Sequence, residues 1–555
     1  MMFPSPSGRA GAVLSAALVL FATCSVGLIL AAWFEPTGDG QGVTVELDGP
    51  SFGKLDTVTF TEDVAPILFE NCSSCHRPSG PAPFKLLTYE DAASRAAEIA
   101  EETERRYMPP WLPTPGEVEF AGERRLASSQ IETIRAWVDA GAPRGDPAHL
   151  PPVPPFHSSW QLGEPDLVAS FPTYEAPSAG RDVYRNFALP VPVDTTRYVR
   201  AVDLRPGNPE VVHHARLMVD STPSSRKLDA ADPEPGFDGM ELRGEATNPS
   251  GHFVGWTPGR VPHGGYEDLA WRLQPGSDLV LQLHLRPTGR RETIRPQIGF
   301  YLTDAPSRSS VLVMLGTEVI DIPAGEARYE VRDSFTLPVP VEVVSVYPHA
   351  HYLGKTMEGL AVLPDGRTRR LIHIADWDFD WQDQYHLAEP VALPAGTVLS
   401  MRYTYDNSTA NPQNPNDPPV RVTYGSSSTD EMADLILQVV PPGPAAAERL
   451  DEELARKYQR GASKYSAWKE YTLGLQAAEQ GRLTVALAHY RASLRERDDP
   501  QVLSAMAEVA VEMDNPGLAI LSLERAIQLA RQARDEGLVE ALRERLERLR
   551  GGVRR

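Results

Sequence analysis

The period of the hydrophobic pattern changes twice along the chain, which excludes a single uniform fold. Over residues 57–147 the apolar residues follow the spacing of short helices. From about 160 to 442 they occur in short β-rich runs, such as Asp278 to His284, separated by Pro, Gly, Asp and Asn. After Pro444 the pattern is helical again. We therefore expect the 555 residues to form a multidomain protein in which each part has its own core.

The first patterned part, residues 57–147, predicts a small all-α domain with three helices. The first begins near Thr61. The second begins at Thr88 and stops before Pro109, and the third begins at Ser129. Thr-x-x-Asp and Ser-x-x-Glu at the last two starts resemble capping boxes, in which two side chains satisfy the free amides of a helix end.

The central part predicts two all-β, jelly-roll-like sandwiches, over residues 160–305 and 306–442. A single immunoglobulin-type sandwich needs roughly 100 residues, so about 280 residues suit two such units better than one.

The C-terminal part, residues 455–550, repeats small and apolar residues every 33 positions. The pairs are Gly474 with Ala507, Ala486 with Ala519, Tyr490 with Leu523, and Ser493 with Ala526. This spacing is close to that of tetratricopeptide helical hairpins, which predicts a short array that binds a protein partner or supports an oligomer. An ordinary four-helix tail is the alternative.

A Cys-x-x-Cys-His motif lies at the end of the first expected helix. Cys72 and Cys75 can reach both vinyl groups of one porphyrin, and the adjacent His76 then points its imidazole at the iron. The alternatives are a disulfide or a zinc site. Zinc would need further thiols or imidazoles, and none lies close in sequence. The motif predicts one covalently bound haem c.

A sixth iron ligand is expected downstream, and Met108 is the candidate. It precedes two prolines, which force an extended segment able to hold a thioether over the open haem face. A thioether opposite an imidazole raises the iron potential and suits electron transfer. The alternative is a methionine that only fills the core. Residues 57–147 resemble c-type cytochrome domains that carry a Met-Pro-Pro-Trp element.

The chain has 13 histidines, and several have metal-ligand spacing. His349 and His351 are two positions apart, so on a strand they project from the same face. His213 and His214 are adjacent and would point to opposite faces, so joint ligation requires a bulge or a strand end. His284 closes a β-rich run. Histidines of a core or loop are the alternative.

Imidazoles without a group of carboxylates favour copper or zinc over magnesium or calcium. Met432 would tilt the choice toward copper, because soft sulfur stabilises the cuprous ion.

Four segments resemble the successive copper motifs of the type II, ascorbate-dependent copper monooxygenases, the family of peptidylglycine α-hydroxylating and dopamine β-monooxygenases. They are Val211–Arg216, Leu281–His284, His349–Lys355 and Ser427–Met432, and their order and spacing agree over about 180–440. The resemblance implies two β-sandwiches that each hold one copper ion.

The same resemblance implies a role for each ligand. His213, His214 and His284 match the ligands of the electron-storing copper. His349, His351 and Met432 match those of the copper that binds dioxygen and faces the substrate, which makes these three the expected catalytic residues.

Two departures from the family matter. Animal members are rich in disulfides, whereas this chain has three cysteines. Where the amidating enzyme holds a peptide carboxylate with Arg and Tyr, this chain has Tyr347 and Ile436. A glycine-extended peptide is therefore not the expected substrate, and the resemblance leaves the small-molecule substrate open.

The N-terminal segment, residues 1–34, is expected to direct export. Arg9 precedes an uncharged apolar run over residues 10–34, which as a helix would span about 37 Å against a hydrocarbon core of ~30 Å. A membrane anchor is favoured, with a cleaved signal peptide or lipidation at Cys24 as alternatives. All three readings place the rest of the chain outside the cytoplasm, in the periplasm.

The formal net charge of −21 argues against a nucleic-acid partner, because phosphates would be repelled. Together these features predict a copper monooxygenase that hydroxylates a C–H bond with dioxygen. Its fused haem would receive electrons from a periplasmic donor and partly replace ascorbate or another reductant. The alternatives are a non-catalytic haem and copper electron-transfer protein, and an assembly or sensory protein that acts through its helical repeats.

Overall fold

The computed structural model describes residues 57–78, 80, 82–116, 118–154, 160–239, 245–306 and 308–553. They lie in one of two compact units of the chain, Thr57–Arg555. The expected membrane segment, residues 10–34, lies outside the described residues, as does Cys24. Among the helices that are described, none combines the length and the apolar character needed to cross a bilayer.

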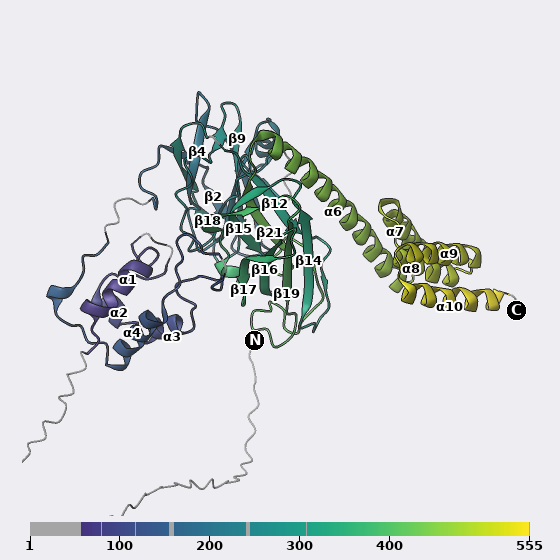
Figure 1. Cartoon of the computed structure of the whole chain (residues 1–555), viewed down its shortest axis with the longest axis horizontal. Coiled ribbons are helices and arrows are strands. Elements are labelled where there is room, and N and C mark those ends of the chain that lie inside the picture. The colour runs from purple at the N-terminus through teal and green to yellow at the C-terminus, as the bar shows by residue number, and fades with distance from the viewer. Residues whose placement is uncertain are drawn as a thin grey trace, which may run out of the picture. The chain divides into compact units, whose positions relative to one another are not determined.

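A small helical region follows the start of this unit (Figure 1). Its elements are η1 (Phe60–Val64), α1 (Ala65–Asn71), α2 (Tyr89–Ala93), α3 (Ala96–Glu104), α4 (Ser128–Asp139) and η2 (Pro147–His149). They share a core that includes the fully buried rings of Phe60 and Trp137.

The helix starts were predicted with mixed success. Thr88 is the N-cap of α2, and its reciprocal hydrogen bonds with Asp91 form the predicted capping box. The single helix expected after it is wrong, because the backbone leaves helical geometry at Arg95 (φ −127°, ψ 20°) and α3 starts anew. The predicted cap at Ser129 is also wrong. The Gln130 side chain accepts a hydrogen bond from the backbone N–H of Ala127, which is the N-cap, and α4 begins at Ser128.

The first β-sandwich is built from two sheets that pack around one apolar core. One sheet has the order β1 (Leu167–Ser170), β11 (Gln297–Thr303), β4 (Arg197–Arg205), β8 (Trp271–Leu273). The other has the order β6 (Phe237–Asp238), β3 (Val183–Pro190), β9 (Asp278–Leu285), β5 (Val212–Asp220), β7 (Val254–Trp256). The pair β10 (Glu292–Ile294) and β2 (Tyr174–Ala176) and the helix α5 (Ser224–Ala231) complete it.

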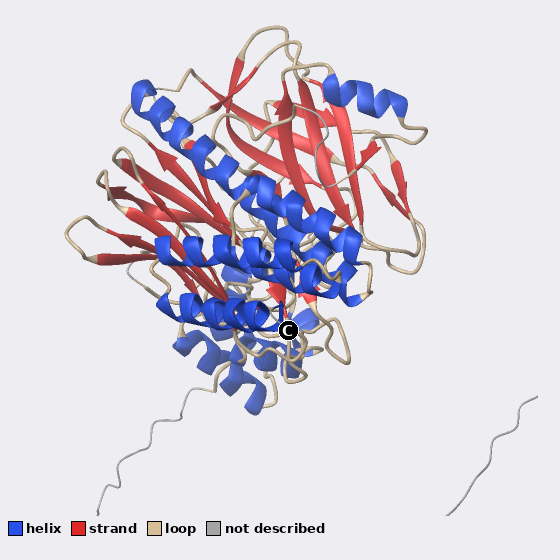
Figure 2. Ribbon diagram, turned by 90° about the vertical axis from the view of Figure 1, so that its right-hand side faces the viewer, coloured by secondary structure: helices blue, strands red, loops and turns tan. Residues whose placement is uncertain are grey.

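The second β-sandwich repeats this arrangement, and Figure 2 shows the strands gathered in two groups. One sheet has the order β12 (Val311–Gly316), β21 (Asp434–Val440), β15 (Val341–His349), β18 (Tyr385–Leu393). The other has the order β14 (Tyr329–Thr336), β19 (Val398–Tyr405), β16 (Gly354–Val362), β17 (Thr368–Ile374). The short pair β13 (Asp321–Ile322) and β20 (Val422–Thr423) and the turn η3 (Phe379–Trp381) complete it.

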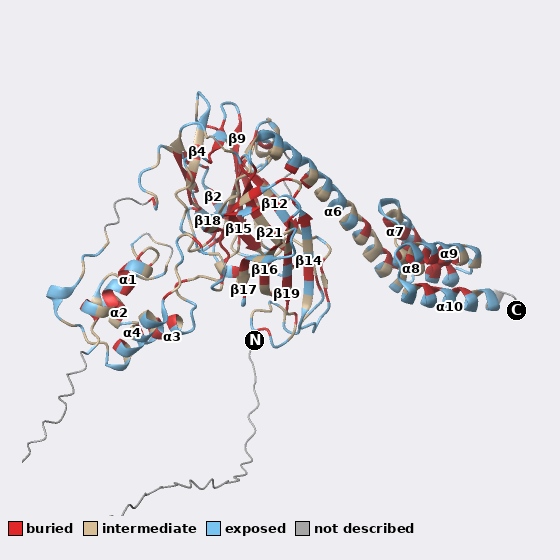
Figure 3. Ribbon diagram, in the orientation of Figure 1, coloured by how far each residue is buried: buried red, intermediate tan, exposed pale blue. Residues whose placement is uncertain are grey.

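Side-chain alternation in these strands places the polar residues that matter for function. In β9, Leu279, Leu281 and Leu283 lie in the core of the first sandwich. Because neighbouring side chains on a strand point to opposite faces, Gln282 and His284 project from the other face. Figure 3 shows the buried residues concentrated along such central strands.

The chain between α3 and α4 lies against the second sandwich. Pro113 forms a β-bridge with Ile374, and Phe120 forms another with Leu387. The Phe120 ring is buried in the core of that sandwich. The helical region is therefore tied to the second sandwich by backbone pairing and by an inserted aromatic ring.

The C-terminal helices are α6 (Pro444–Glu479), α7 (Leu483–Glu496), α8 (Pro500–Glu512), α9 (Pro516–Gln532) and α10 (Glu536–Val553). Every residue of the predicted 33-residue spacing is buried. Gly474 permits close approach of α6 and α7, because a Cβ atom there would lie 2.4 Å from the Tyr490 ring. The first half of α6 belongs to the second sandwich, since Leu450 and Leu454 lie in its core.

Candidate haem pocket and metal centres

The first histidine group depends on an irregularity in β5. The register with β9 shifts between Val212 and His214, so His213 is an extra residue at this point of the ladder. Val212 and Ala215, three positions apart, both lie in the core. Joint ligation required a bulge or a strand end at this point, and the structure has a bulge.

The bulge brings three ring nitrogens together. The Nδ1 atoms of His213 and His214 lie 3.2 Å apart, and those of His214 and His284 lie 3.4 Å apart. Two nitrogens that bind one ion tetrahedrally at about 2.0–2.1 Å are about 3.3 Å apart. The three imidazoles therefore have the spacing of a shared metal site, and among the described residues they form a group able to hold an ion.

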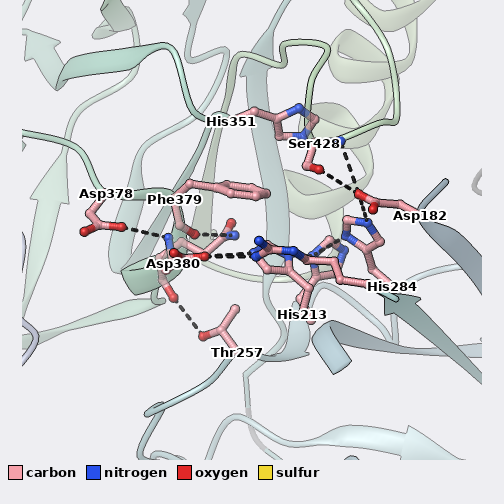
Figure 4. Close-up of polar contacts among 12 residues, drawn as sticks. Asp182, His213, Thr257, His284, His351, Asp378, Phe379, Asp380 and Ser428 are labelled. Atoms are coloured by element: carbon pink, nitrogen blue, oxygen red, sulfur yellow. Dashed lines mark hydrogen bonds and ion pairs between the residues drawn. The ribbon is translucent and has the colours of Figure 1, made fainter. Parts of the chain in front are cut away.

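Asp182 fixes the orientation of His284. The Nε2–H of His284 donates to the Asp182 carboxylate at 3.0 Å, which leaves Nδ1 with its lone pair toward the other two rings. Ser428, from the loop before β21, also donates to Asp182, at 2.7 Å (Figure 4). Burial raises the pKa of Asp182, but the hydrogen bonds from His284 and Ser428 outweigh it and hold that pKa well below its usual value.

Two members of the first group, His213 and His214, are held neutral, as metal ligation requires. Burial, followed by the nearby His284 and Arg286, lowers the pKa of His213 to about 2. Burial, followed by the nearby His284 and His213, lowers the pKa of His214 well below 6.5. Protons therefore do not compete with a metal ion for the ring nitrogens of His213 and His214 near neutral pH.

The second histidine group offers its other ring nitrogens. His349 donates from Nδ1 to the amide oxygen of Gln382 at 2.7 Å, and His351 donates from Nδ1 to the backbone oxygen of Asp430 at 3.0 Å. Each Nε2 atom is then the one with a lone pair. The ring centroids lie 5.3 Å apart with the planes at 81°. Burial lowers the pKa of His349 to about 4 and that of His351 to about 3.

Met432 lies beside this second group. Its backbone oxygen accepts the Tyr405 hydroxyl at 2.7 Å, and the preceding Glu431 accepts the backbone N–H of His351 at 3.1 Å. Burial raises the pKa of Glu431 to about 8. Met432 and His349 line one cavity, while the role of Met432 as third ligand stays a prediction.

That cavity, of about 310 Å³, lies between the outer faces of β5 and β9 and those of β15 and β21. His214 borders it from the first group, with its ring centroid 6.4 Å from that of His349. Tyr347 and Ile436, which pair across β15 and β21, also line it. The two residues that depart from the amidating enzymes therefore face the cavity next to the second group.

A second, mostly apolar cavity of about 340 Å³ contains the Cys-x-x-Cys-His motif. Cys72, Cys75, His76 and Met108 all line it. Both cysteines are free thiols, which argues against the disulfide reading. The structure brings together the four residues expected around the iron.

His76 has the hydrogen bond expected of an iron ligand. Its Nδ1 donates to the backbone oxygen of Phe84 at 3.1 Å, which leaves the Nε2 lone pair for an ion. Burial lowers the pKa of His76. Burial and the adjacent Cys75 raise the pKa of the Cys72 thiol to about 12. The donor set, the thiols and the apolar walls fit a covalent haem.

Sequence reasoning missed the residues that orient the histidines. Asp182 precedes β3 and carries no motif, and Gln382 follows the run Trp377-Asp-Phe-Asp-Trp381. That aromatic and acidic run was visible in the sequence, but no spacing rule connects it to metal ligands. Only the fold brings Gln382 beside His349.

Comparisons with known proteins identify no family. No protein-family model matches the chain, and no curated protein matches it. Similar solved structures include the VP2 subviral particle of infectious bursal disease virus, with 10% identity over 51% of this chain and 74% of that one, and a TM-score of 0.16. The major capsid protein P2 of bacteriophage PM2 has 11% identity over 50% of this chain and 95% of that one, with a TM-score of 0.19. TM-scores this low carry no argument about fold or function.

Proposed function

We propose that this protein is a copper-dependent monooxygenase that hydroxylates a C–H bond of a small substrate, with electrons delivered through its own c-type haem. One observation carries the proposal. His214 from one histidine group, and His349 with Met432 from the other, border a single cavity large enough for a small molecule. The class is that of the type II copper monooxygenases, as the four sequence motifs suggest.

The reaction fixes how many electrons the protein must handle. Dioxygen, a C–H bond, two electrons and two protons give an alcohol and water. Copper bound at the two histidine groups would supply one-electron redox chemistry at each site. A covalent haem would supply a further one-electron store. Two ligand sets and one haem pocket in a single chain therefore suit a reaction that needs paired electrons.

The chain's own residues then orient the metals and shape the cavity. Asp182 holds His284, while Gln382 and the Asp430 backbone hold the second group, so that lone pairs rather than N–H groups face the ions. Tyr347 and Ile436 give the cavity an aromatic and aliphatic wall. These walls favour a substrate whose reacting carbon lies in an apolar part of the molecule.

The other parts of the chain have supporting roles in this proposal. The helical region is a cytochrome c-like domain, and residues 10–34 anchor the protein on the periplasmic side of the membrane. The C-terminal hairpins form a tetratricopeptide-like array that docks a protein partner. A periplasmic one-electron donor reduces the haem.

Oxygen consumption tests the proposal. Copper-loaded holoprotein is supplied with a reductant and screened against a library of small metabolites, with Met432→Ala as the matched variant. We expect one compound class to stimulate oxygen uptake together with a product heavier by one oxygen atom, and Met432→Ala to lose that activity. Equal activity in Met432→Ala would show that the oxygen site is wrongly assigned.

A haem and copper electron-transfer protein without oxygenase activity is the second candidate. It is favoured by the fact that only the first histidine group forms a complete set of three His, Cys or carboxylate ligands among the described residues. This candidate predicts that the protein binds both haem and copper but takes up no oxygen with any substrate tested.

A further inference from the structure

One four-residue segment contacts the haem pocket and the first histidine group. It runs from Phe379 to Gln382 and consists of η3 and the residue after it. Trp381 lines the cavity that contains Cys72. Phe379, two residues earlier, lies against His213, with ring centroids 4.2 Å apart and planes tilted by 30°.

The same segment contacts the second histidine group. Phe379 is almost fully buried and lies 5.2 Å from His351 between ring centroids, and Figure 4 shows its ring between His351 and His213. Gln382 accepts the hydrogen bond from His349 and also donates to the backbone oxygen of Phe379 at 3.1 Å. A single short segment therefore joins all three candidate redox centres.

The position of Trp381 is fixed from two sides. Its ring makes an edge contact with Tyr107, with centroids 5.5 Å apart. On the other side lies Gly259, at φ +77°, where an added Cβ would be in van der Waals contact with the ring at 3.4 Å. Thr257 donates to the backbone oxygen of Gln382 at 2.7 Å. Two separate segments, the chain at Tyr107 and the loop over Thr257 and Gly259, therefore hold this part of the chain at the pocket wall.

We propose that Phe379–Gln382 is the electron path from the haem to the copper sites, with Trp381 as its haem end and Phe379 as its copper end. Electron transfer through protein falls steeply with distance and passes more readily along bonds and packed rings than across gaps. Only Asp380 separates the two rings along the backbone. This inference rests on the proposed function, because it assumes that both cofactors bind where their ligands converge.

The step is a single electron transfer. One electron leaves the ferrous iron, which becomes ferric, and a cupric ion held by His213, His214 and His284 becomes cuprous. No bond forms or breaks, and no proton is needed. The ferric iron is reduced again by a one-electron donor of the ascorbate or small-cytochrome class.

The test measures the transfer itself rather than turnover. In oxygen-free holoprotein loaded with cupric ion, the haem is reduced by a light flash through a ruthenium photoreductant, and its reoxidation is followed by absorbance. We expect Trp381→Leu and Phe379→Leu each to slow reoxidation by about tenfold or more, equivalent to ~1.4 kcal/mol on a barrier. Trp381→Phe keeps a ring at the pocket and should slow it less.

Tyr352→Leu is the matched control. Tyr352 also packs on Phe379, with centroids 4.7 Å apart, but it does not line the haem pocket. Haem reoxidation in the Tyr352→Leu variant should be as fast as in the wild type. Haem absorbance and copper content are measured in every variant, and Trp381→Phe decides the question if Trp381→Leu fails to take up haem.

Unchanged reoxidation in Phe379→Leu and in the haem-loaded Trp381 variant would overturn the path. If the wild type transfers the electron along this route but no substrate stimulates oxygen uptake, the proposed oxygenase activity fails while the path stands. If ascorbate-driven hydroxylation proceeds and the Trp381 variants do not alter the flash kinetics, the path fails while the activity stands.

Discussion

The two histidine groups are oriented by different means. In the first, a bulge turns His213 and His214 toward His284, and three Nδ1 atoms converge. In the second, His349 and His351 use their Nδ1 atoms as hydrogen-bond donors and leave Nε2 for the metal. The first group is closed by a third imidazole, whereas the second has two imidazoles and a cavity beside it that Met432 also lines.

This difference suggests a division of labour. Three converging imidazoles resemble a site that holds its ion in one geometry, as suits a centre that stores an electron. A site with two imidazoles, a soft ligand and an adjacent cavity keeps a position open for a reactant. The hydrogen-bond partners of each histidine decide which ring nitrogen is left with a lone pair. In the first group this is Nδ1, and in the second it is Nε2.

The largest expected effect is the loss of one copper site at a time. His214→Ala removes the central nitrogen of the first group, and His349→Ala removes one of two imidazoles from the second. We expect each variant to bind one copper fewer. Its copper affinity at the altered site should fall by more than about 100-fold, which is more than the loss of a residue that only hydrogen-bonds a ligand would cause. Metal analysis and electron paramagnetic resonance measure this. Two coppers retained in His214→Ala would show that the three nitrogens do not share an ion.

Changes in the orienting residues should have intermediate effects. Asp182→Ala frees the His284 ring, and Gln382→Leu frees the His349 ring. Each should weaken copper binding at its own site by about 10–100-fold and leave the other nearly unchanged. Competition titrations with a copper chelator measure both sites. Because Asp182 also binds Ser428, Ser428→Ala serves as the control that removes only this second contact.

The sequence predicted the convergence of His213, His214 and His284 better than the surroundings of the histidines. The alternation rule and the bulge requirement follow from strand geometry, so the places of His284 and of the His213–His214 pair could be inferred from local pattern. Asp182 and Gln382 could not, because they reach the histidines from β-strand connections about 100 and 33 residues away. Such contacts depend on how sheets pack, which local periodicity does not encode.

The predicted start of α4 was wrong for a related reason. Several side chains within one or two residues of each other could cap the same helix end. At the start of α4 it is Gln130, rather than Glu132, that accepts a hydrogen bond from the free N–H of Ala127. The 33-residue spacing identified buried positions correctly, because every residue that it pairs is buried in the helical region. Helix α6 begins at Pro444, before the predicted repeats, and its first turns pack on the second sandwich, which only tertiary contact reveals.

A third group of histidines tests whether burial alone makes a metal site. His263 and His386 are stacked with ring centroids 4.0 Å apart and planes within 12°. Lone pairs lie in the ring planes, so two parallel rings do not aim at one ion. We expect His386→Phe to leave the copper content at two per chain, which distinguishes convergence from burial. A lost copper would contradict the assignment of the sites.

The same variant should change the response to acid. Burial, followed by His263 and Arg260, lowers the pKa of His386 well below 6.5. The native side chain is then neutral, while the unfolded chain takes up a proton as the pH falls below about 6.5. Its contribution to stability is therefore complete above that pH and is lost toward acid, with a slope of at most ~1.4 kcal/mol per pH unit. Urea unfolding of the metal-free protein between pH 5 and 7 should show a shallower slope in His386→Phe. An identical slope would mean that this imidazole is already protonated in the native state.

The smallest effect is expected from removing the helical repeats, and the cut must respect the shared helix. Tyr458 of α6 lines the cavity beside the second histidine group, and Lys457 pairs with Asp333 of β14. Deleting residues 470–555 keeps these contacts and removes α7 to α10. Copper content, haem absorbance and flash kinetics should then match the full chain, because neither histidine group draws a residue from those helices. A deletion of residues 450–555 is the contrasting variant, and it should weaken the second site alone by stripping a wall from its cavity. Equal loss at both sites in the shorter deletion would show that the repeats support the sandwiches as well as any partner.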